Sequence, residues 1–88
     1  MKVFFRKSFE KDLDKLRDKA LLAKIKAEIE AIENAETLQA ITSAKKLQGE
    51  GNCYRIRVGD YRIGLTADQG TVTFIRVLHR KEVYRYFP

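Results

Sequence analysis

Cysteine is nearly absent from this chain, with Cys53 as its single example in 88 residues. One cysteine excludes an internal disulfide and gives no metal-ligand spacing. We expect Cys53 to be a small buried hydrophobic residue beside a strand. Long apolar runs are also missing, because none approaches the ~20 residues that a membrane-spanning helix needs. The N-terminus lacks a signal-peptide pattern. We therefore expect a soluble cytoplasmic protein that does not bind membranes.

Histidine is equally scarce: the chain has only His79 and no helical His/Glu pair. Together with the single cysteine, this leaves no residue set typical of a metal site. The sequence also lacks linkers, repeats and low-complexity segments. Hydrophobic residues make up 44% and charged residues 34%, which is typical of a globular protein. We expect residues 1–88 to form a single domain that uses neither a metal nor another cofactor.

Positive charge is present in excess and is unevenly distributed. The net charge is +6, and residues 1–44 hold nine basic and eight acidic side chains, whereas residues 45–88 hold nine and four. A positive excess confined to one half of a chain favours binding to a polyanion, and RNA in particular. The alternative is a charge excess that only improves solubility.

The first half of the chain predicts a strand followed by two helices. Residues 1–6 (MKVFFR) form the strand, and Ser8 is placed to cap a helix that carries Phe9, Leu13 and Leu16 at helical spacing. A second helix is predicted from about residue 20 to residue 33, with Asn34 as its stop. Its apolar stripe consists of Leu22, Ile25, Ile29 and Ile32. Residues 35–52 are predicted to be irregular.

The second half predicts three strands joined by tight turns. The strands are Tyr54–Val58, Tyr61–Thr66 and Thr71–Leu78, and a short tail follows. Gly59-Asp60 suits a type II′ hairpin turn, and residues 68–70 make the next turn. The order β-α-α-β-β-β predicts an α+β domain. We expect a mostly antiparallel four-stranded sheet with an N-terminal helical hairpin packed on one face.

Arginines recur at alternate positions of these strands. Because side chains alternate between the faces of a strand, Arg55 and Arg57 share one face, opposite Ile56. Arg62 likewise lies opposite its core neighbours Tyr61, Ile63 and Leu65. Guanidinium groups bind phosphate well. We expect this face to contact RNA, with a wider steering field from Arg76, Lys81 and Arg85.

Two segments carry a resemblance to a known family, KKLQGEGNCYRIRVGDYRIGL and RVLHRKEVYR. With the element order, they resemble the RelE/ParE superfamily of bacterial toxins from type II toxin–antitoxin systems. Members of the RelE branch cleave mRNA in the ribosomal A site, and members of the ParE branch poison DNA gyrase. The tail HRKEVYR is more similar to the RelE branch.

The resemblance implies roles for individual residues. Arg55 and Arg57 stand where the RelE-type YKIK motif has two lysines. Arg62 matches an arginine that grips phosphate, and Arg80 is the counterpart of a second catalytic arginine. Tyr84 matches a tyrosine that stacks on or orients the substrate base.

Metal-free RNA cleavage needs a base for the 2′-hydroxyl, cations for the phosphate and an acid for the leaving 5′-oxygen. Arginine cannot readily be the base. His79 is therefore the first candidate, since histidine titrates near neutral pH. Weaker candidates are Lys45, Lys46 and Glu50, and the two lysines are also expected to contact RNA.

The resemblance implies a ribosome-dependent mRNA endonuclease, and attack by the 2′-hydroxyl would leave a 2′,3′-cyclic phosphate and a 5′-hydroxyl. By the resemblance, its partners are the ribosome, mRNA and a cognate antitoxin, with operator DNA bound only through the antitoxin complex. Two alternatives stay open: a ParE-type inhibitor of DNA gyrase, and an inactive homologue that only binds its antitoxin.

Overall fold

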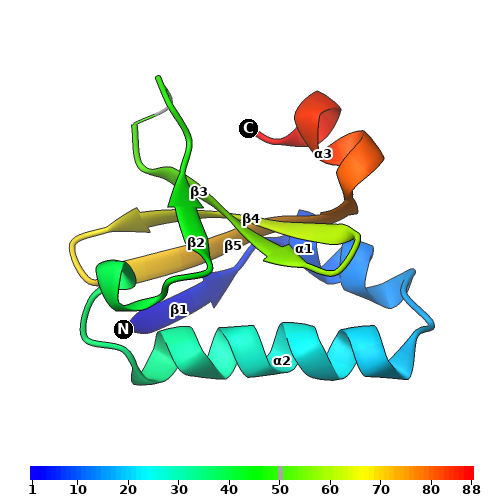
Figure 1. Ribbon diagram of the computed structural model, residues 1–88, viewed down its shortest axis with the longest axis horizontal. Coiled ribbons are helices and arrows are strands. Elements are labelled where there is room, and N and C mark those ends of the chain that lie inside the picture. Colours follow the sequence, from blue (N-terminus) through cyan, green and yellow to red (C-terminus); the bar gives the residue numbers. More distant parts are fainter. Residues whose placement is uncertain (50) are drawn as a thin grey trace.

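The computed structural model of the protein describes residues 1–49 and 51–88. Over these residues, five strands form one mixed sheet in the order β1-β5-β4-β3-β2 (Figure 1). The strands are β1 (Lys2–Phe5), β2 (Ala44–Lys46), β3 (Cys53–Val58), β4 (Tyr61–Asp68) and β5 (Thr71–His79). The helices are α1 (Lys7–Asp14), α2 (Lys19–Asn34), the 3-10 turn η1 (Leu38–Ala40) and α3 (Arg80–Tyr86). Glu50, one of the candidate bases, lies outside the described residues.

The predicted α+β class and the N-terminal helical pair are confirmed, but the strand count was wrong. Strand β2 adds a fifth member at the edge, inside the segment predicted to be irregular, and pairs only with β3. Strand β1 runs parallel to β5, and the other three pairings are antiparallel. None of the helices in the described ranges combines the length and apolar character needed to cross a bilayer.

Helices α1 and α2 cover one face of the sheet, below it in Figure 1. Their apolar stripes supply Phe9, Ile25 and Ile32, all essentially inaccessible to solvent, to a core shared with alternate residues of β3, β4 and β5. The predicted cap at Ser8 was wrong, because α1 begins after Arg6. The Ser8 hydroxyl donates instead to the carbonyl of Ile75, 2.6 Å away.

The two predicted turns are present, and each has a glycine with a positive φ. Gly59 has φ +58° at the first position of the β3–β4 turn. In the β4–β5 turn, Gln69 and Gly70 have φ +47° and +79°. These turns fix the register of the three antiparallel strands, and the register in turn decides which side chains share a face.

Helix α3 lies on the opposite face, above the sheet in Figure 1. Only a short tail was predicted after the last strand, but Arg80–Tyr86 form a helix. Val83 and Phe87 are almost fully buried and form a second small cluster with Leu78. Phe87 packs flat against β4 at Gly64, where an added Cβ would come within 2.5 Å of the ring. Apolar contacts therefore hold α3 over the same face as the predicted arginines.

Candidate nucleic-acid interface

Strand register gathers four basic side chains on the face that carries α3. Lys45 of β2 lies opposite Arg55 of β3, and Arg57 lies opposite Arg62 of β4. Directly opposed residues of an antiparallel pair project to the same side of a sheet. Lys45, Arg55, Arg57 and Arg62 are here called the basic face. The alternation predicted for β3 holds, since Ile56 and Val58 are buried on the other side.

Arg62 is held in place by the β3–β4 turn. Its Nη1 donates to the carbonyls of Gly59, at 3.0 Å, and Tyr61, at 2.8 Å. Within the described residues its other nitrogens make no hydrogen bond, so they stay available to a ligand. A guanidinium fixed in this way loses little conformational entropy when it binds phosphate.

Arg55 lies beneath Tyr84, which reaches it from α3. The guanidinium carbon is 4.4 Å from the ring centroid, a cation–π distance. The Nε atom of Arg55 is buried without a hydrogen-bond partner among the described residues. The Tyr84 side chain is 77% exposed, so its ring is open to a stacking base. The contact brings together two residues that the sequence placed at one site.

Arg80 joins the site from the base of α3. Its backbone N–H donates to the carbonyl of Asp60 at 2.7 Å, and its Nε lies 3.9 Å from the Asp60 carboxylate. Both side chains are more than half exposed, so the ion pair is weak. Arg80 and Arg62 thus both contact the same two-residue turn. Lys81 and Arg85 are exposed on α3.

His79 is not brought to the basic face. It pairs with Tyr61 across β4 and β5, and the two rings meet edge to face at 5.4 Å. Its Nδ1 accepts the backbone N–H of Lys81 and caps α3. The ring lines a pocket of about 320 Å³ at the edge of the sheet, together with Asp12 of α1 and with Glu82 and Tyr86 of α3. Because its partner Tyr61 packs in the core beneath α1 and α2, the register directs His79 to that side of the sheet, away from Arg62.

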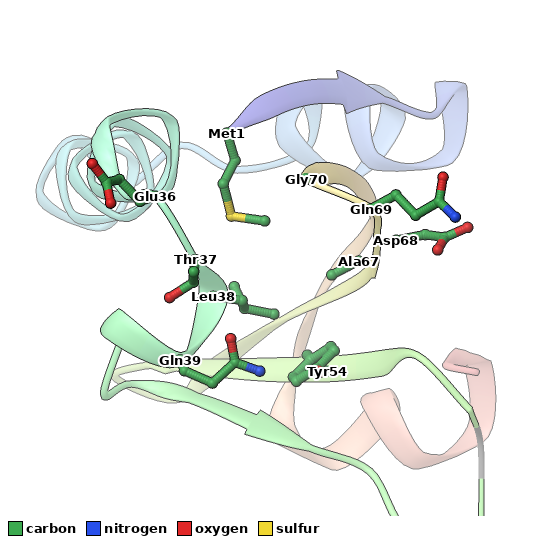
Figure 2. A pocket seen from close by; sticks show the side chains of 10 residues that line it. All are labelled: Met1, Glu36, Thr37, Leu38, Gln39, Tyr54, Ala67, Asp68, Gln69 and Gly70. Carbon is green, nitrogen blue, oxygen red and sulfur yellow. The ribbon is translucent and has the colours of Figure 1, made fainter.

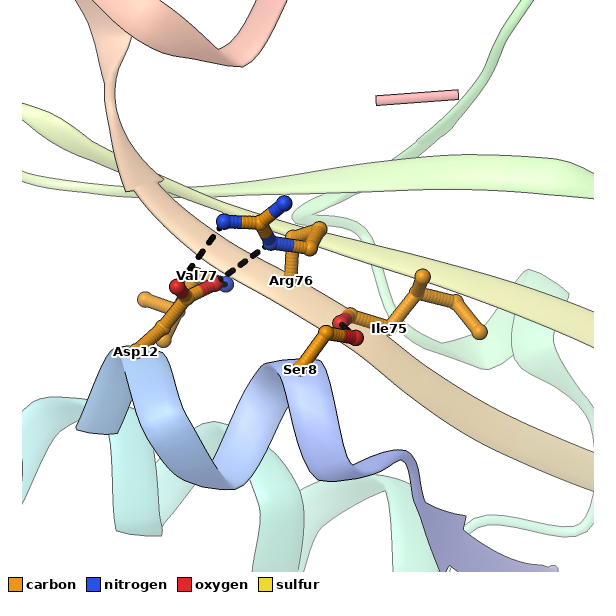
Figure 3. A network of polar contacts seen from close by, with 5 residues as sticks. All are labelled: Ser8, Asp12, Ile75, Arg76 and Val77. Atoms are coloured by element: carbon orange, nitrogen blue, oxygen red, sulfur yellow. Dashed lines mark hydrogen bonds and ion pairs between the residues drawn. The ribbon is translucent and has the colours of Figure 1, made fainter. Parts of the chain in front are cut away.

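Lys46 and Arg76 are also separated from the basic face. Lys46 lies opposite Tyr54, so its side chain leaves the sheet on the side of α1 and α2. Arg76 is bound to Asp12 of α1 (Figure 3) through Nε at 2.8 Å and Nη2 at 3.0 Å. This hydrogen-bonded contact raises the pKa of Arg76 above its ordinary value, against the opposing effect of burial.

Asp12 is a buried structural residue that the sequence analysis did not single out. Besides Arg76, its carboxylate accepts the backbone N–H of Val77 at 3.0 Å. Ser8, four residues earlier on the same face of α1, binds the carbonyl of Ile75 (Figure 3). The two side chains satisfy backbone groups of β5 beyond the end of β1. Ser8 and Asp12 are four residues apart and flank the buried Phe9, and this spacing could have indicated a polar contact with the sheet.

A pocket of about 240 Å³ lies elsewhere, between the segment after α2 and the β4–β5 turn (Figure 2). Met1, Leu38 and Tyr54 line it together with two carboxylates, Glu36 and Asp68, and no lysine or arginine. Carboxylates repel phosphate, so this pocket does not suit RNA. The candidate interface is the open basic face with its flanking helix.

Comparison with known proteins agrees with this architecture. The family described as the ParE toxin of type II toxin–antitoxin systems matches residues 3–84. Toxin RelE3 of Methanocaldococcus jannaschii is 46% identical over 89 residues that span both chains completely. In the RelB–RelE antitoxin–toxin complex from Methanococcus jannaschii, one chain is 44% identical and superposes with a TM-score of 0.82, covering 97% of this chain and 99% of that one. The RelBE2 toxin–antitoxin complex of Mycobacterium tuberculosis has a chain with 27% identity and a TM-score of 0.69, covering 90% of each.

An α+β sheet with a helical pair on one face and a short helix over a basic face on the other defines a small toxin fold. The chain belongs to the ParE toxin family of type II toxin–antitoxin systems, within the RelE/ParE superfamily. The two relatives from jannaschii species, at 46% and 44% identity, carry the name RelE.

Proposed function

We propose that this toxin is a ribosome-dependent mRNA endonuclease of the RelE type, acting in the cytoplasm. The basic face holds the scissile phosphate, and α3 supplies a stacking side chain. The products are a 2′,3′-cyclic phosphate and a 5′-hydroxyl, formed without a metal ion.

The observation that carries this proposal is the convergence of Arg55, Arg57 and Arg62 on one face of the sheet, with Tyr84 stacked on Arg55. Guanidinium groups on adjacent strands can bind a phosphate through several hydrogen bonds at once and stabilise its added charge in the transition state. Arg80 approaches the same turn as Arg62 and can bind the flanking phosphate. A surface used only for solubility would need neither the turn-bound Arg62 nor a tyrosine stacked on Arg55.

An antitoxin is the proposed regulatory partner. The solved relatives from Methanococcus jannaschii and Mycobacterium tuberculosis are toxin–antitoxin complexes. An acidic segment of the antitoxin would be attracted to the basic face and could fold on binding. Operator DNA would then be contacted only through the complex.

The test is to add purified protein to stalled ribosomes that carry a defined mRNA with an open A site, and to map cuts by primer extension. The expected result is a discrete cut in the A-site codon that is absent with the Arg80→Ala/Tyr84→Phe double variant. Arg17→Ala, an exposed arginine beyond α1, is the matched control and should cut normally. An intact message with wild-type protein would overturn the proposal.

The second candidate function is inhibition of DNA gyrase, which the description of the matching family as ParE favours. It predicts loss of supercoiling activity in a gyrase assay together with an intact ribosomal message. If the protein neither cuts mRNA nor inhibits gyrase, an inactive homologue that binds its antitoxin is the remaining interpretation.

A further inference from the structure

The basic face has three arginines but no arginine can easily accept the proton of a 2′-hydroxyl. The base must therefore come from another residue that reaches the same face. His79 and Lys46 project to the α1–α2 side of the sheet, as their partners Tyr61 and Tyr54 show. The structure thus removes two of the bases that the sequence suggested.

Lys45 is different, because the register of β2 places it directly opposite Arg55. Opposed residues of an antiparallel pair have Cβ atoms about 5 Å apart, so the flexible lysine stem can reach the phosphate that Arg55 binds. Lys45 is exposed, and within the described residues it makes no ion pair or side-chain hydrogen bond. Its amine is therefore not committed to a structural contact.

We propose that Lys45 is the general base of the cleavage reaction, supplied by the edge strand β2 in place of the lysines that the family has on the β3 hairpin. This inference rests on the proposed nuclease function. The unprotonated amine of Lys45 takes the proton of the 2′-hydroxyl. The 2′-oxygen forms a bond to phosphorus, and the bond from phosphorus to the 5′-oxygen breaks. The 5′-oxygen takes a proton from water, and Lys45 returns its own proton to solvent.

Lys45→Arg is the decisive variant, because arginine keeps the positive charge and the length of the side chain but cannot be the base. Single-turnover cleavage on A-site ribosomes is measured from pH 6 to pH 9 for wild type and variants. Wild type should cut faster as the pH rises. Lys45→Arg should cut about 10²- to 10⁴-fold more slowly and lose that dependence on pH, as removal of a general base requires. Co-sedimentation with ribosomes should be unchanged, since the charge is retained.

Two lysines provide the matched controls. Lys46→Arg changes the adjacent residue on the other side of the sheet, and its rate should fall by much less than that of Lys45→Arg. Lys26→Arg, on the exposed surface of α2, should cut at the wild-type rate and with the wild-type dependence on pH.

The possible outcomes distinguish a failure of the proposed base from a failure of the proposed nuclease function. Full activity of Lys45→Arg, with wild type cutting, would show that Lys45 contributes charge alone and would overturn the inference only. An equal loss in Lys46→Arg, or a larger loss in Lys81→Arg on α3, would also overturn it. An intact message with wild-type protein would remove the proposed function and this inference together.

Discussion

An arginine side chain that is already immobilised binds phosphate at a smaller entropic cost, and Arg62 meets this condition. Its Nη1 is bound to the carbonyls of Gly59 and Tyr61, so its planar group is oriented before any RNA arrives. The same contacts also give Arg62 a structural role, because they stabilise the β3–β4 turn. Strand alternation alone does not predict this role. Replacing Arg62 should therefore affect both the turn and the chemistry.

Arg62→Lys should separate these effects, because it keeps the charge but loses the planar group. We expect cleavage to fall roughly 10- to 100-fold, and stability to fall by about 1 kcal/mol for the lost turn contacts. A-site cleavage and urea unfolding measure the two effects. Arg17→Lys is the control and should alter neither. Wild-type cleavage by folded Arg62→Lys would show that the oriented planar group is not needed.

Asp12 is the residue on which the attachment of α1 to β5 depends. Asp12→Ala would leave the guanidinium of Arg76 and the N–H of Val77 without their acceptor. We expect a loss of about 2–3 kcal/mol in the free energy of unfolding, less than for a fully buried pair because Arg76 is partly exposed. Asp14→Ala, exposed on the same helix, should change stability by no more than about 0.5 kcal/mol.

The titration of Arg76 determines how the stability lost in Asp12→Ala depends on pH. The pKa of Arg76 is raised above its ordinary value in the folded protein by the contact with Asp12. The stabilisation by this contact is therefore fully present below the ordinary pKa of arginine and is lost only as the pH rises through the higher folded value. Arginine titration therefore leaves the difference between wild type and Asp12→Ala constant from pH 6 to pH 9. A difference that shrinks steadily across this range would contradict the assignment.

At the scale of elements, the sequence predicted those with strong apolar periodicity and missed those without it. Helix α2 and strands β3–β5 carry clear apolar patterns and tight turn residues, and the structure has them. Strand β2 consists only of Ala44-Lys45-Lys46, which has no apolar pattern, and it is a strand because its backbone pairs with β3. Helix α3 could have been found from Val83 and Phe87, four residues apart, with His79 at the cap. The position of Lys45 depends on the register of β2, which no local pattern encodes.

Helix α3 is attached through the contact between Phe87 and Gly64. Gly64→Ala should push the ring away, because its Cβ would lie 2.5 to 2.8 Å from three of the ring atoms. We expect a loss of about 1–3 kcal/mol in stability and a weaker contact between Tyr84 and Arg55, hence slower cleavage.

A double-variant cycle tests this explanation. In the Phe87→Ala background the added methyl group has no ring to displace, so Gly64→Ala should cost much less. If the two costs simply add, Phe87 is not the cause of the strain. Unfolding in urea provides the four free energies.

His79 has a role in the same element as the N-cap of α3. His79→Leu should loosen the first turn by about 1 kcal/mol and slow cleavage, since Tyr84 depends on this helix. His79→Asn should restore most of the rate, because asparagine is a good cap and a poor base. If His79→Asn lowers the cleavage rate as much as His79→Leu does, His79 takes part in the cleavage reaction itself. Single-turnover cleavage distinguishes these outcomes.

The whole molecule has two unlike faces, with apolar packing of α1 and α2 on one and the basic face with α3 on the other (Figure 1). The net charge of +6 is therefore effective where a polyanion would bind. Binding to a short single-stranded RNA should weaken with salt, and Arg57→Met should reduce the slope of log affinity against log salt by about 0.7. Lys26→Met on α2 should leave the slope unchanged, as fluorescence anisotropy at several salt concentrations would show. Equal slopes for wild type and Arg57→Met would place the RNA elsewhere.

The parallel pairing of β1 with β5 has a consequence for the order of folding. Residues 2–5 must wait for residues 71–74 before their backbone groups are paired, and α1 binds β5 through Ser8 and Asp12. Both β1 and α1 thus depend on contacts with β5, yet β5 is synthesised after both of them. A nascent chain that stops before residue 71 has neither a closed sheet nor a surface for α3. The contacts of β1 and α1 with the sheet can therefore form only after this late strand has been synthesised.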